Sequence, residues 1–597
     1  MSTQTIENFF TGKTLVIPSY QRDYAWRERN MNDLFDDVEE AQEVSSKHYL
    51  GTFILSKQDE NSPVHHVVDG QQRLTTLTML LDALIDVVDD ASIKQHYRNT
   101  FVHHPVTGAK FRVLGANEAF FRDLLDEKSP QPCSDGQEKM LIAYRWIRQR
   151  VAALLDKGGQ QLVKDWLLCI SNMEVLQFIE PNEGKAIRMF QSVNDRGVPL
   201  AKMDIVKSLL VYYSNRYLNG ELDTVISERF GEAFRSFSRI KRLAGEPGYK
   251  IRVIDRDTFR EDDVLRYHYF AFDGTPFGLS AGGDFWATSG TVLEVFLKPA
   301  LKNLRSDINK LREFIAAYIT DLTQFFAGLE ALVLATRTDR QSYLLWVTQD
   351  LSATLYPLII RLHLKGWLHK QSAVDRRSLM EIIELSDLRV FKLRGTNPQS
   401  DVFRITRELH QQSIAWVIEE LQHFCDRFMP DAMMASRLVD EDMYRNPAVQ
   451  RMLLQEEARS RATVGEPELS LQELATLNQH GLTVEHIFPQ DPDNSFNIGS
   501  YSFATEDDYL QHKNRIGNLV LLEGGINSAC SNRTVEAKMT APALYMASSL
   551  SAVKAVAAAS AGNRRFDRSQ LVERSQQLST AMVACWPIRL PFQPSSS

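Results

Sequence analysis

The sequence predicts an α+β protein that is mostly helical, and three observations support this fold class. Short extended runs alternate with helical patterns over residues 1–215, helical periodicity dominates residues 216–440, and two extended apolar runs precede an Ala-rich helix in residues 441–597. A chain of 597 residues is long enough for two to four domains. We therefore expect one domain in each of these three ranges.

The N-terminal range is expected to hold a small mixed sheet with helices. Runs rich in β-branched and aromatic residues predict strands at residues 15–20, 49–55, 65–68 and 173–180. Leucines recur at helical spacing after the third of these strands, so a helix should cover residues 71–88. Further helices are expected at residues 184–197 and 201–213.

The rest of the chain is expected to be helical apart from its C-terminal part. The clearest helical patterns in the middle cover residues 304–326 and 343–366, and a Gly-rich loop is expected at 272–286. A linker is expected at residues 461–470. The extended runs that follow it are LTVEHIF and IGNLVLL, and the Ala-rich helix covers residues 546–562.

Composition narrows the class of protein. Hydrophobic residues make up 44% of the chain and charged residues 24%, as in globular proteins. No apolar run reaches the roughly 18–20 residues of a membrane span, and the N-terminus lacks the pattern of a signal peptide. The five cysteines form no C-x-x-C pair, so neither a disulfide framework nor a thiolate zinc site is indicated. We expect a cytoplasmic protein with no membrane partner.

Charge is distributed unevenly along the chain. The net charge of −8 argues against nucleic-acid binding over the whole surface. Residues 509–597, however, contain ten Lys or Arg residues against four acidic ones, a difference of +6. This segment is either a local nucleic-acid-binding face or an ordinary solvated surface.

A glutamate and a histidine stand side by side in TVEHIFPQ, residues 483–490. Asn518 lies 32 residues after His486, and Asn527 lies nine residues after Asn518. This spacing is typical of a metal-dependent nuclease, which hydrolyses phosphodiesters. The reaction develops negative charge, which a divalent cation stabilises. Mg²⁺ prefers oxygen ligands such as the Glu485 carboxylate and the Asn527 carbonyl. A neutral imidazole suits the base for an attacking water, so His486 is the candidate base.

Two more residues complete this C-terminal set. Asn518 can hold the loop that positions His486, and Lys538, in the helix expected next, could reach the scissile phosphate. Because adjacent strand residues face opposite sides, Glu485 and His486 can share one site only at a strand end or bend. The alternative interpretation is a surface histidine beside two turn asparagines.

Two polar stretches follow predicted strands in the N-terminal range, IPSYQRDYAW at residues 17–26 and VVDGQQRLTTL at residues 67–77. We expect Asp69 to cap a helix whose free amides and dipole favour an anion. Arg73 could add a bidentate contact, and the alternative is a structural ion pair for Arg73. Together the stretches predict a nucleotide site, with Tyr24 or Trp26 stacking on the base. Its candidate residues are Gln21, Arg22, Tyr24, Trp26, Asp69, Gly70, Gln71, Gln72 and Arg73.

The C-terminal motif, over about residues 480–545, resembles the HNH (ββα-metal) nuclease superfamily. The resemblance implies that His486 is the general base, that Glu485 and Asn527 are metal ligands, and that Asn518 orders the loop. The third motif position is often histidine in this superfamily. Asparagine at that position favours Mg²⁺ or Mn²⁺ over zinc.

Both N-terminal stretches, with FQSVNDRGVPLAKMDIVK at residues 190–207, resemble the N-terminal domain of the GmrSD family of modification-dependent restriction enzymes. The resemblance implies a ParB/sulfiredoxin-like α/β domain, and it adds Asn194 and Lys207 to the nucleotide site. The family pairs this domain with a C-terminal nuclease in the same order. The sequence has no G-x-x-x-x-G-K-[ST] motif, so hydrolysis of a nucleotide would have to use the Gln-Arg motifs.

The resemblance implies a type IV restriction endonuclease, BrxU-like, that cleaves modified double-stranded phage DNA and is regulated by binding or hydrolysis of ATP or GTP. One nuclease site per chain suggests a homodimer for cutting both strands. The first alternative is an SspE-like sensor of phosphorothioate DNA with NTPase and nickase activity. The second is a nucleotide-binding regulatory protein whose nuclease is vestigial.

Overall fold

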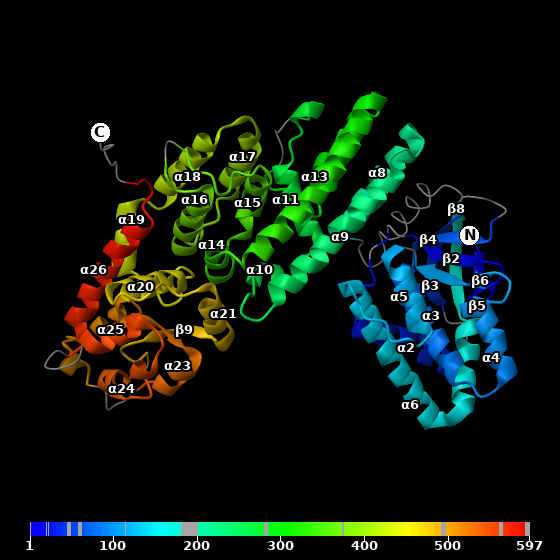
Figure 1. Ribbon diagram of the computed structural model, residues 1–597, viewed down its shortest axis with the longest axis horizontal. Coiled ribbons are helices and arrows are strands. Elements are labelled where there is room, and N and C mark those ends of the chain that lie inside the picture. The colour runs from blue at the N-terminus through cyan, green and yellow to red at the C-terminus, as the bar shows by residue number, and fades with distance from the viewer. Residues whose placement is uncertain are drawn as a thin grey trace. The chain divides into compact units, whose positions relative to one another are not determined.

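The computed structural model is mostly helical with one mixed sheet, which confirms the α+β class (Figure 1). It describes residues 2–18, 21, 23–44, 49–57, 62–113, 115–180, 201–279, 285–372, 375–490, 497–559 and 565–590. The chain divides into two compact units, residues 1–239 with 289–323, and residues 240–288 with 324–597. The division into three domains stays a prediction.

The first unit contains a six-stranded mixed sheet in the order β1-β8-β3-β4-β2-β7. Strand β2 lies parallel to β4 and to β7, whereas β3 is antiparallel to β4 and parallel to β8. The sheet confirms the strands expected from the sequence. Its strands are β1 (Ser2–Thr5), β2 (Thr14–Ile17), β3 (Tyr49–Ser56), β4 (Val64–Asp69), β7 (Phe111–Val113) and β8 (Glu174–Glu180).

Helix α3 (Gln71–Val87) lies at the centre of the first unit, and nearly all of its side chains are buried. It packs against α6 (Asp135–Asn172), which is kinked at Gly159, where φ is 62°. Phe35 of α2 contacts Trp146 and Trp166 of α6, so α2 belongs to the same core. The unit also contains α1 (Ile6–Phe10), α2 (Glu28–Val44), α4 (Ala91–Tyr97), a small hairpin of β5 (His103–His104) and β6 (Gly108–Ala109), α5 (Glu118–Leu125), α8 (Lys202–Leu218) and α12 (Lys298–Leu304).

Two helices predicted for the first half of the chain have different outcomes. The helix expected at residues 201–213 is α8, which confirms that prediction. The helix expected at residues 184–197 lies outside the described residues. Two long helices, α9 (Asp223–Gly245) and α13 (Ile308–Ala335), each include the boundary between the two units.

Residues 343–366 do not form the single helix that the sequence predicts. Helix α14 (Arg340–Tyr343) continues only as a π-helical turn to Thr348, and Asp350 has a positive φ of 57°. The buried Asp387 carboxylate accepts the backbone N–H of Ser352 at 3.1 Å, which fixes the chain in this break. Pro357, in the first turn of α15 (Tyr356–Leu364), suits a helix start because it has no N–H to donate.

The second unit is built from helices around one short strand pair. No single helix among the described residues is long and apolar enough to cross a membrane, although α13 and residues 340–348 meet that length and composition as a bent pair. The helices before the strand pair are α10 (Arg252–Asp255), α11 (Glu261–Ala271), α14, α15, α16 (Leu379–Ser386), α17 (Gln399–Glu408), α18 (Ile414–Phe428), α19 (Asp431–Asp440), α20 (Val449–Thr463) and α21 (Leu471–His480).

The strand pair consists of β9 (Leu482–His486) and β10 (Leu519–Glu523), which run antiparallel. The helices that complete this region are α22 (Glu506–His512), α23 (Gly524–Cys530), α24 (Val535–Thr540), α25 (Ser551–Ala559) and α26 (Arg568–Cys585). Helix α26 lies against the turn before β10, and a Cβ at Gly517 would overlap the Leu571 carbonyl of α26. Glycine is therefore needed at this close approach.

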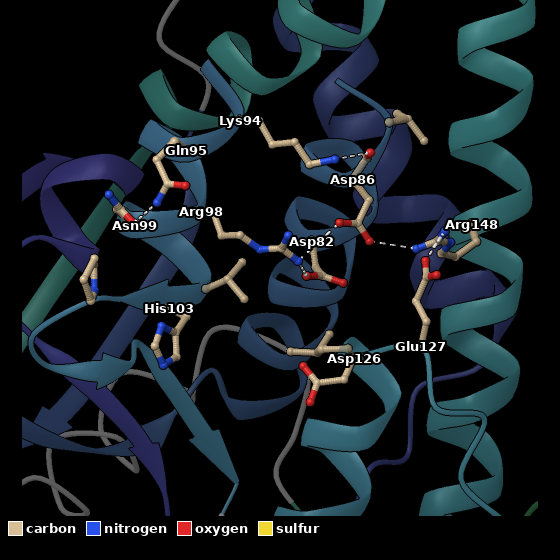
Figure 2. Close-up of a pocket in the computed structure, with 14 residues that line it drawn as sticks. Asp82, Asp86, Lys94, Gln95, Arg98, Asn99, His103, Asp126, Glu127 and Arg148 are labelled. Atoms are coloured by element: carbon tan, nitrogen blue, oxygen red, sulfur yellow. Dashed lines mark hydrogen bonds and ion pairs between the residues drawn. The ribbon is translucent and has the colours of Figure 1, made fainter. Parts of the chain in front are cut away.

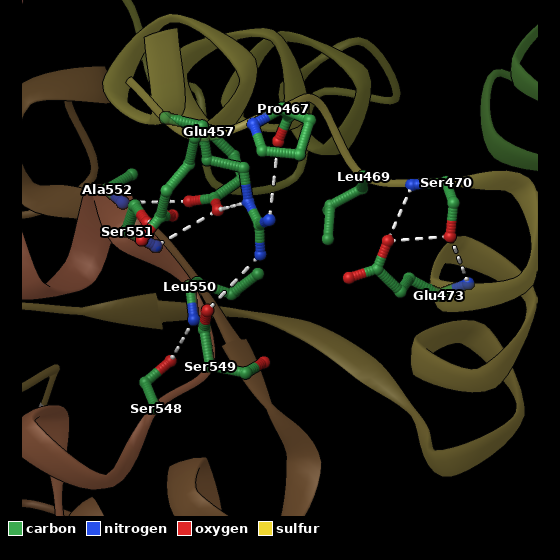
Figure 3. Close-up of polar contacts among 12 residues, drawn as sticks. Glu457, Pro467, Leu469, Ser470, Glu473, Ser548, Ser549, Leu550, Ser551 and Ala552 are labelled. Atoms are coloured by element: carbon green, nitrogen blue, oxygen red, sulfur yellow. Dashed lines mark hydrogen bonds and ion pairs between the residues drawn. The ribbon is translucent and has the colours of Figure 1, made fainter. Parts of the chain in front are cut away.

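A buried carboxylate attaches α25 to α20. Glu457 is 1% exposed and accepts the backbone N–H groups of Ser551, at 3.0 Å, and Ala552, at 2.8 Å (Figure 3). Arg461 donates to the same carboxylate at 2.7 Å. The carboxylate thus satisfies amides at the start of α25 that no helical carbonyl can reach, which holds the Ala-rich helix beside the strand pair.

Candidate functional site

The two polar N-terminal stretches lie together in the first unit, at the carboxyl ends of the neighbouring parallel strands β2 and β4. Gln72 accepts the Ala25 N–H at 2.8 Å and donates to the Asp23 carbonyl at 3.2 Å. The Tyr24 hydroxyl lies 2.7 Å from the Thr76 hydroxyl. These contacts bring the motifs side by side, and they also engage the side chains of Gln72 and Tyr24 within the protein.

The start of α3 differs from the prediction. The N-cap is Gly70, with φ of 89° and no side-chain cap, so the expected capping role of Asp69 is wrong. A Cβ at Gly70 would overlap the Phe53 ring, which together with the positive φ explains the glycine. Burial raises the pKa of Asp69 to about 6, against the opposing charge of Arg73.

Arg73 and Gln71 remain available for a ligand at this turn. The Arg73 guanidinium lies over Gly51 and 5.7 Å from the centre of the Phe53 ring. Among the described residues it makes no ion pair, so the structural ion pair considered as an alternative is not found there. The buried side-chain oxygen of Gln71 has no hydrogen-bond partner within the described chain.

The other candidates for the nucleotide site differ in their burial, and two of them lie outside the described residues. Tyr24 is 4% exposed, and burial raises its pKa, so its ring belongs to the core and cannot stack on a ligand as expected. Trp26 packs against the same core and is partly buried, Gln21 is half-buried, and Lys207 is buried on α8. Arg22 and Asn194 lie outside the described residues.

The first unit also has a polar cavity at the other end of α3 (Figure 2). Arg98 and Arg148 reach Asp86 at 3.3 and 3.0 Å, and Tyr144 donates to the Asp82 carboxylate at 2.9 Å. Asp82 is fully buried, and burial, with the neighbouring charge of Asp86, raises its pKa to about 7. Asp86 and Glu127 of this cavity are therefore already paired with Arg98 or Arg148 of the same cavity.

The raised pKa of Asp82 predicts a pH-dependent stability. Between about pH 4 and pH 7, the Asp82 carboxyl stays protonated in the folded state but is ionised in the unfolded chain. The contribution of Asp82 to the free energy of unfolding therefore falls as pH rises through that window. Asp82→Asn should therefore stabilise the protein at pH 8 by on the order of 2 kcal/mol and change little near pH 4. Urea denaturation at both pH values measures this, with Asp126→Asn in the same cavity as the control. An equal effect of Asp82→Asn at both pH values would contradict the prediction.

In the second unit, His486 is the last residue of β9, opposite Leu519 of β10. Its side chain is 5% exposed, and the Tyr444 ring lies 4.2 Å from the imidazole, centre to centre. His486 Nε2 is 2.9 Å from Asn514 Oδ1, and Asn514 Nδ2 donates to Asp442 Oδ2 at 2.8 Å. The imidazole is thus held by a hydrogen-bonded chain from Asp442 through Asn514.

This chain assigns the tautomer of His486. A carboxylate only accepts hydrogen bonds, so the Asn514 amide turns its NH₂ group to Asp442 and its oxygen to His486. His486 Nε2 then carries the proton, and Nδ1 keeps the lone pair that a base requires. Burial lowers the pKa of His486, which favours the neutral imidazole.

Asn518 organises the chain that leaves His486. Its side chain is fully buried and accepts the Phe488 N–H at 2.8 Å, while its amide donates to the Lys513 carbonyl at 2.6 Å. The backbone carbonyl of Asn518 also accepts the Ile487 N–H at 2.8 Å. These are the contacts that a loop-ordering asparagine needs.

Lys538 lies in a helix, as the sequence predicts, but its side chain does not point to where a substrate phosphate was expected. It is fully buried on α24, pairs with Glu485 Oε1 at 2.7 Å and donates to the His486 carbonyl at 2.6 Å. Because Glu485 is itself 6% exposed and holds the Lys538 ammonium group, this group points inward rather than toward a substrate phosphate. Burial raises the pKa of Glu485, and the charge of Lys538 opposes this shift.

Asn527 of α23 lies on the same face of β9 as Glu485. Its amide donates to the Thr483 hydroxyl at 2.8 Å, and Thr483 and Glu485 alternate along the strand. The carbonyl oxygen of Asn527 therefore turns away from Thr483. Within the described residues, no three His, Cys, Asp or Glu side chains lie close enough to hold a metal ion between them.

The positive excess of residues 509–597 is partly neutralised within the fold. Of the nine basic residues of this segment that the structure describes, five pair with carboxylates, namely Lys538, Arg565, Arg568, Arg574 and Arg589. Lys513 and Arg515 precede β10 in the turn that Asn518 holds, and both are half-buried. The segment is thus a mixture of structural ion pairs and solvated cations.

Sequence reasoning missed Asp442, Tyr444 and Asn514. Asn514 directly precedes the predicted strand IGNLVLL in NRIGN, residues 514–518, and its only sequence signal is that it is a polar residue four positions before Asn518. Asp442 and Tyr444 lie more than 40 residues before His486, in the segment after α19, and no local pattern marks them.

Comparison with protein families matches both ends of the chain. Residues 6–211 match the GmrSD restriction endonuclease N-terminal domain, and residues 429–581 match the GmrSD restriction endonuclease C-terminal domain. A comparison with curated proteins gives no match. Together the two domains cover more than half of the chain. The first includes residues 69–73 at the start of α3, called here the Gln-Arg turn, and the second includes His486. The chain therefore belongs to the GmrSD family of restriction endonucleases, which makes it a nuclease that acts on DNA.

Proposed function

We propose that this endonuclease hydrolyses phosphodiester bonds of modified double-stranded phage DNA at an HNH-type site around His486. The observation that carries the proposal is the hydrogen-bonded chain from Asp442 through Asn514 to His486. It leaves Nδ1 of a neutral imidazole free to take a proton from an attacking water. Asn518 contributes by holding the backbone that follows this base and the Lys513 carbonyl before β10.

Glu485 and Asn527 are the residues that would hold a divalent metal ion. Their donor chemistry fits Mg²⁺ or Mn²⁺, because both supply oxygen atoms on one face of β9 and such ions keep several water ligands. When bound, the ion would stabilise the charge that develops on the phosphate. Lys538 already holds one oxygen of Glu485, and its charge favours the ionised form of this carboxylate.

The N-terminal domain, for which we propose a ParB/sulfiredoxin-like fold, would bind ATP or GTP at the start of α3 and regulate cleavage. The support is the Gly70 turn, with the uncommitted Arg73 guanidinium and Gln71 side chain beside it. A phosphate there would meet the free amides at the N-terminus of a long helix. Cutting of both strands would use a homodimer with one site from each chain.

A substrate panel tests the proposal. The protein is incubated with plain, hydroxymethylated, glucosylated and phosphorothioated DNA, with Mg²⁺ or Mn²⁺ or with EDTA, and with ATP, GTP or no nucleotide. We expect cleavage of a base-modified DNA that needs metal and responds to a nucleotide. Nicking of phosphorothioate DNA alone would favour the SspE-like alternative, and no cleavage of any DNA would favour a vestigial nuclease. Full cleavage in EDTA would rule out the metal mechanism.

Asn514 is predicted to position the base. Asn514→Ala removes the acceptor that fixes the His486 tautomer, so kcat should fall about 10–100-fold while KM for DNA stays unchanged. Asn514→Asp keeps an acceptor oxygen for His486 but loses the donor to Asp442, so its activity should lie between that of Asn514→Ala and that of the wild type. The control is Asn478→Ala on α21, because the Asn478 amide donates to the Gly248 carbonyl at 3.3 Å and not to His486. A change in KM alone would mean that Asn514 contacts DNA instead.

A further inference from the structure

A basic cavity lies at the amino ends of parallel strands in the N-terminal sheet, whereas the Gln-Arg turn lies at their carboxyl ends. Strands β2, β4 and β7 are parallel, and the cavity adjoins their amino ends, where Thr14, Pro63 and Lys110 stand. Its volume is about 360 Å³, and its lining contains Lys13, Lys110, His96, His104 and no carboxylate. A cavity of this size can hold a small ligand, and its composition favours an anion.

Lys110 is the main reason to expect a ligand. The residue is 5% exposed and lines the cavity, yet no described carboxylate lies within ion-pair distance of its ammonium group. Its backbone is fixed, because its N–H donates to the Val102 carbonyl and its carbonyl accepts the Leu15 N–H. A buried cation without a counter-ion destabilises the folded protein, and a bound anion would remove that cost.

Lys13 brings a second positive charge to the same cavity. Its ammonium group donates to the Phe9 carbonyl at 3.0 Å and to the Asn8 carbonyl at 3.3 Å, at the end of α1, and it has no carboxylate partner within the described residues. Three N–H donors on a lysine leave one for a ligand. Burial and the charge of Lys110 lower the pKa of Lys13, so the two ammonium groups lie close enough to repel each other.

The histidines supply one further donor. His104 Nδ1 accepts the backbone N–H groups of Val106, at 3.2 Å, and Thr107, at 3.3 Å, so the proton of the neutral ring is on Nε2. His96 pairs with Glu7 at 3.4 Å, and this carboxylate is outside the cavity lining. The hydroxyl groups of Thr11, Thr14, Thr100 and Thr107 also border the cavity.

We propose that this cavity binds a phosphate group, held by Lys13, Lys110 and His104, at a site separate from the Gln-Arg turn. The cavity offers several hydrogen-bond donors, namely two lysines, a histidine N–H and threonine hydroxyls, and its lining contains no carboxylate. This set suits the several acceptor oxygens of a phosphate. The phosphate belongs either to a free nucleotide or pyrophosphate, or to the backbone of DNA.

The test compares binding to wild type, Lys110→Met, Lys13→Met and Lys157→Met. Lys157 is exposed on α6 in the same unit, so its replacement removes the same charge outside the cavity. Calorimetry uses inorganic phosphate, pyrophosphate and ATP, and fluorescence anisotropy uses a short DNA duplex. We expect at least one probe to bind at least tenfold more weakly to Lys110→Met and to Lys13→Met, with Lys157→Met unchanged. If the lysine variants lose binding of the small anions, the ligand is a free phosphate. If they lose binding of the duplex alone, the ligand is the DNA backbone.

Thermal unfolding gives a second measurement, which does not require that the variants bind a ligand. Lys110→Met removes an unpaired buried charge, so the unliganded variant should melt at or above the wild-type temperature, and the stabilisation of wild type by pyrophosphate should disappear. Arg73→Ala separates this cavity from the Gln-Arg turn, because it should retain the Lys110-dependent binding. Equal binding of every probe to Lys110→Met and Lys157→Met, or no binding of any probe to wild type, would overturn the proposal.

Discussion

His486→Ala is expected to lower DNA cleavage about 10³-fold or more while DNA and nucleotide binding persist. The variant removes the only imidazole that the Asp442–Asn514 chain orients among the described residues, and general-base catalysis contributes about 10²–10⁴-fold. The backbone around position 486 is held by Asn518 and by pairing with β10, so the fold should survive.

The measurement is single-turnover cleavage of a DNA that the wild type cuts, with binding followed separately. His480→Ala serves as the matched control, because His480 is an exposed histidine at the end of α21 in the same unit. We expect His480→Ala to cleave at the wild-type rate. A His486→Ala protein that is folded and cuts as fast as His480→Ala would remove His486 from the role of base.

Lys538→Met is expected to destabilise the second unit by about 3–5 kcal/mol, because it leaves the Glu485 carboxylate buried without a partner. The double variant Glu485→Gln/Lys538→Met removes both charges and should recover most of that loss. Burial already raises the pKa of Glu485, so the loss in Lys538→Met should shrink as pH falls and the carboxylate takes up a proton.

Urea denaturation in EDTA measures these stabilities without a contribution from bound cations. The control is Lys298→Met, since Lys298 pairs with Glu294 on an exposed helical surface, where a substitution changes stability by about 0.5 kcal/mol or less. If Lys538→Met is no less stable than Lys298→Met, the buried pair is not a structural element and Lys538 regains its role as a candidate for phosphate contact. A double variant as unstable as Lys538→Met would show that packing, rather than charge, makes the difference.

Local patterns in the sequence determined the elements that carry the candidate sites. β-Branched runs marked β3, β4 and β8, and leucine spacing marked α3, because each pattern reflects which side chains a strand or helix must bury. The pattern failed at residues 343–366, where the apolar spacing is helical but Asp387, a distant residue, holds Ser352 in a break. Periodicity cannot report a hydrogen bond formed across 35 residues.

The resemblance to the HNH superfamily implied that His486, Asn518 and Asn527 belong to one site, and in the structure all three lie on or beside the strand pair of β9 and β10. The tertiary structure alone decided what each side chain faces. Lys538 points inward because it pairs with the buried Glu485 carboxylate. The Tyr24 ring lies in the core because its hydroxyl forms a hydrogen bond with the Thr76 hydroxyl. Asp442 is linked to His486 through Asn514. Burial and long-range pairing set these orientations, and both depend on residues that are far apart in the chain.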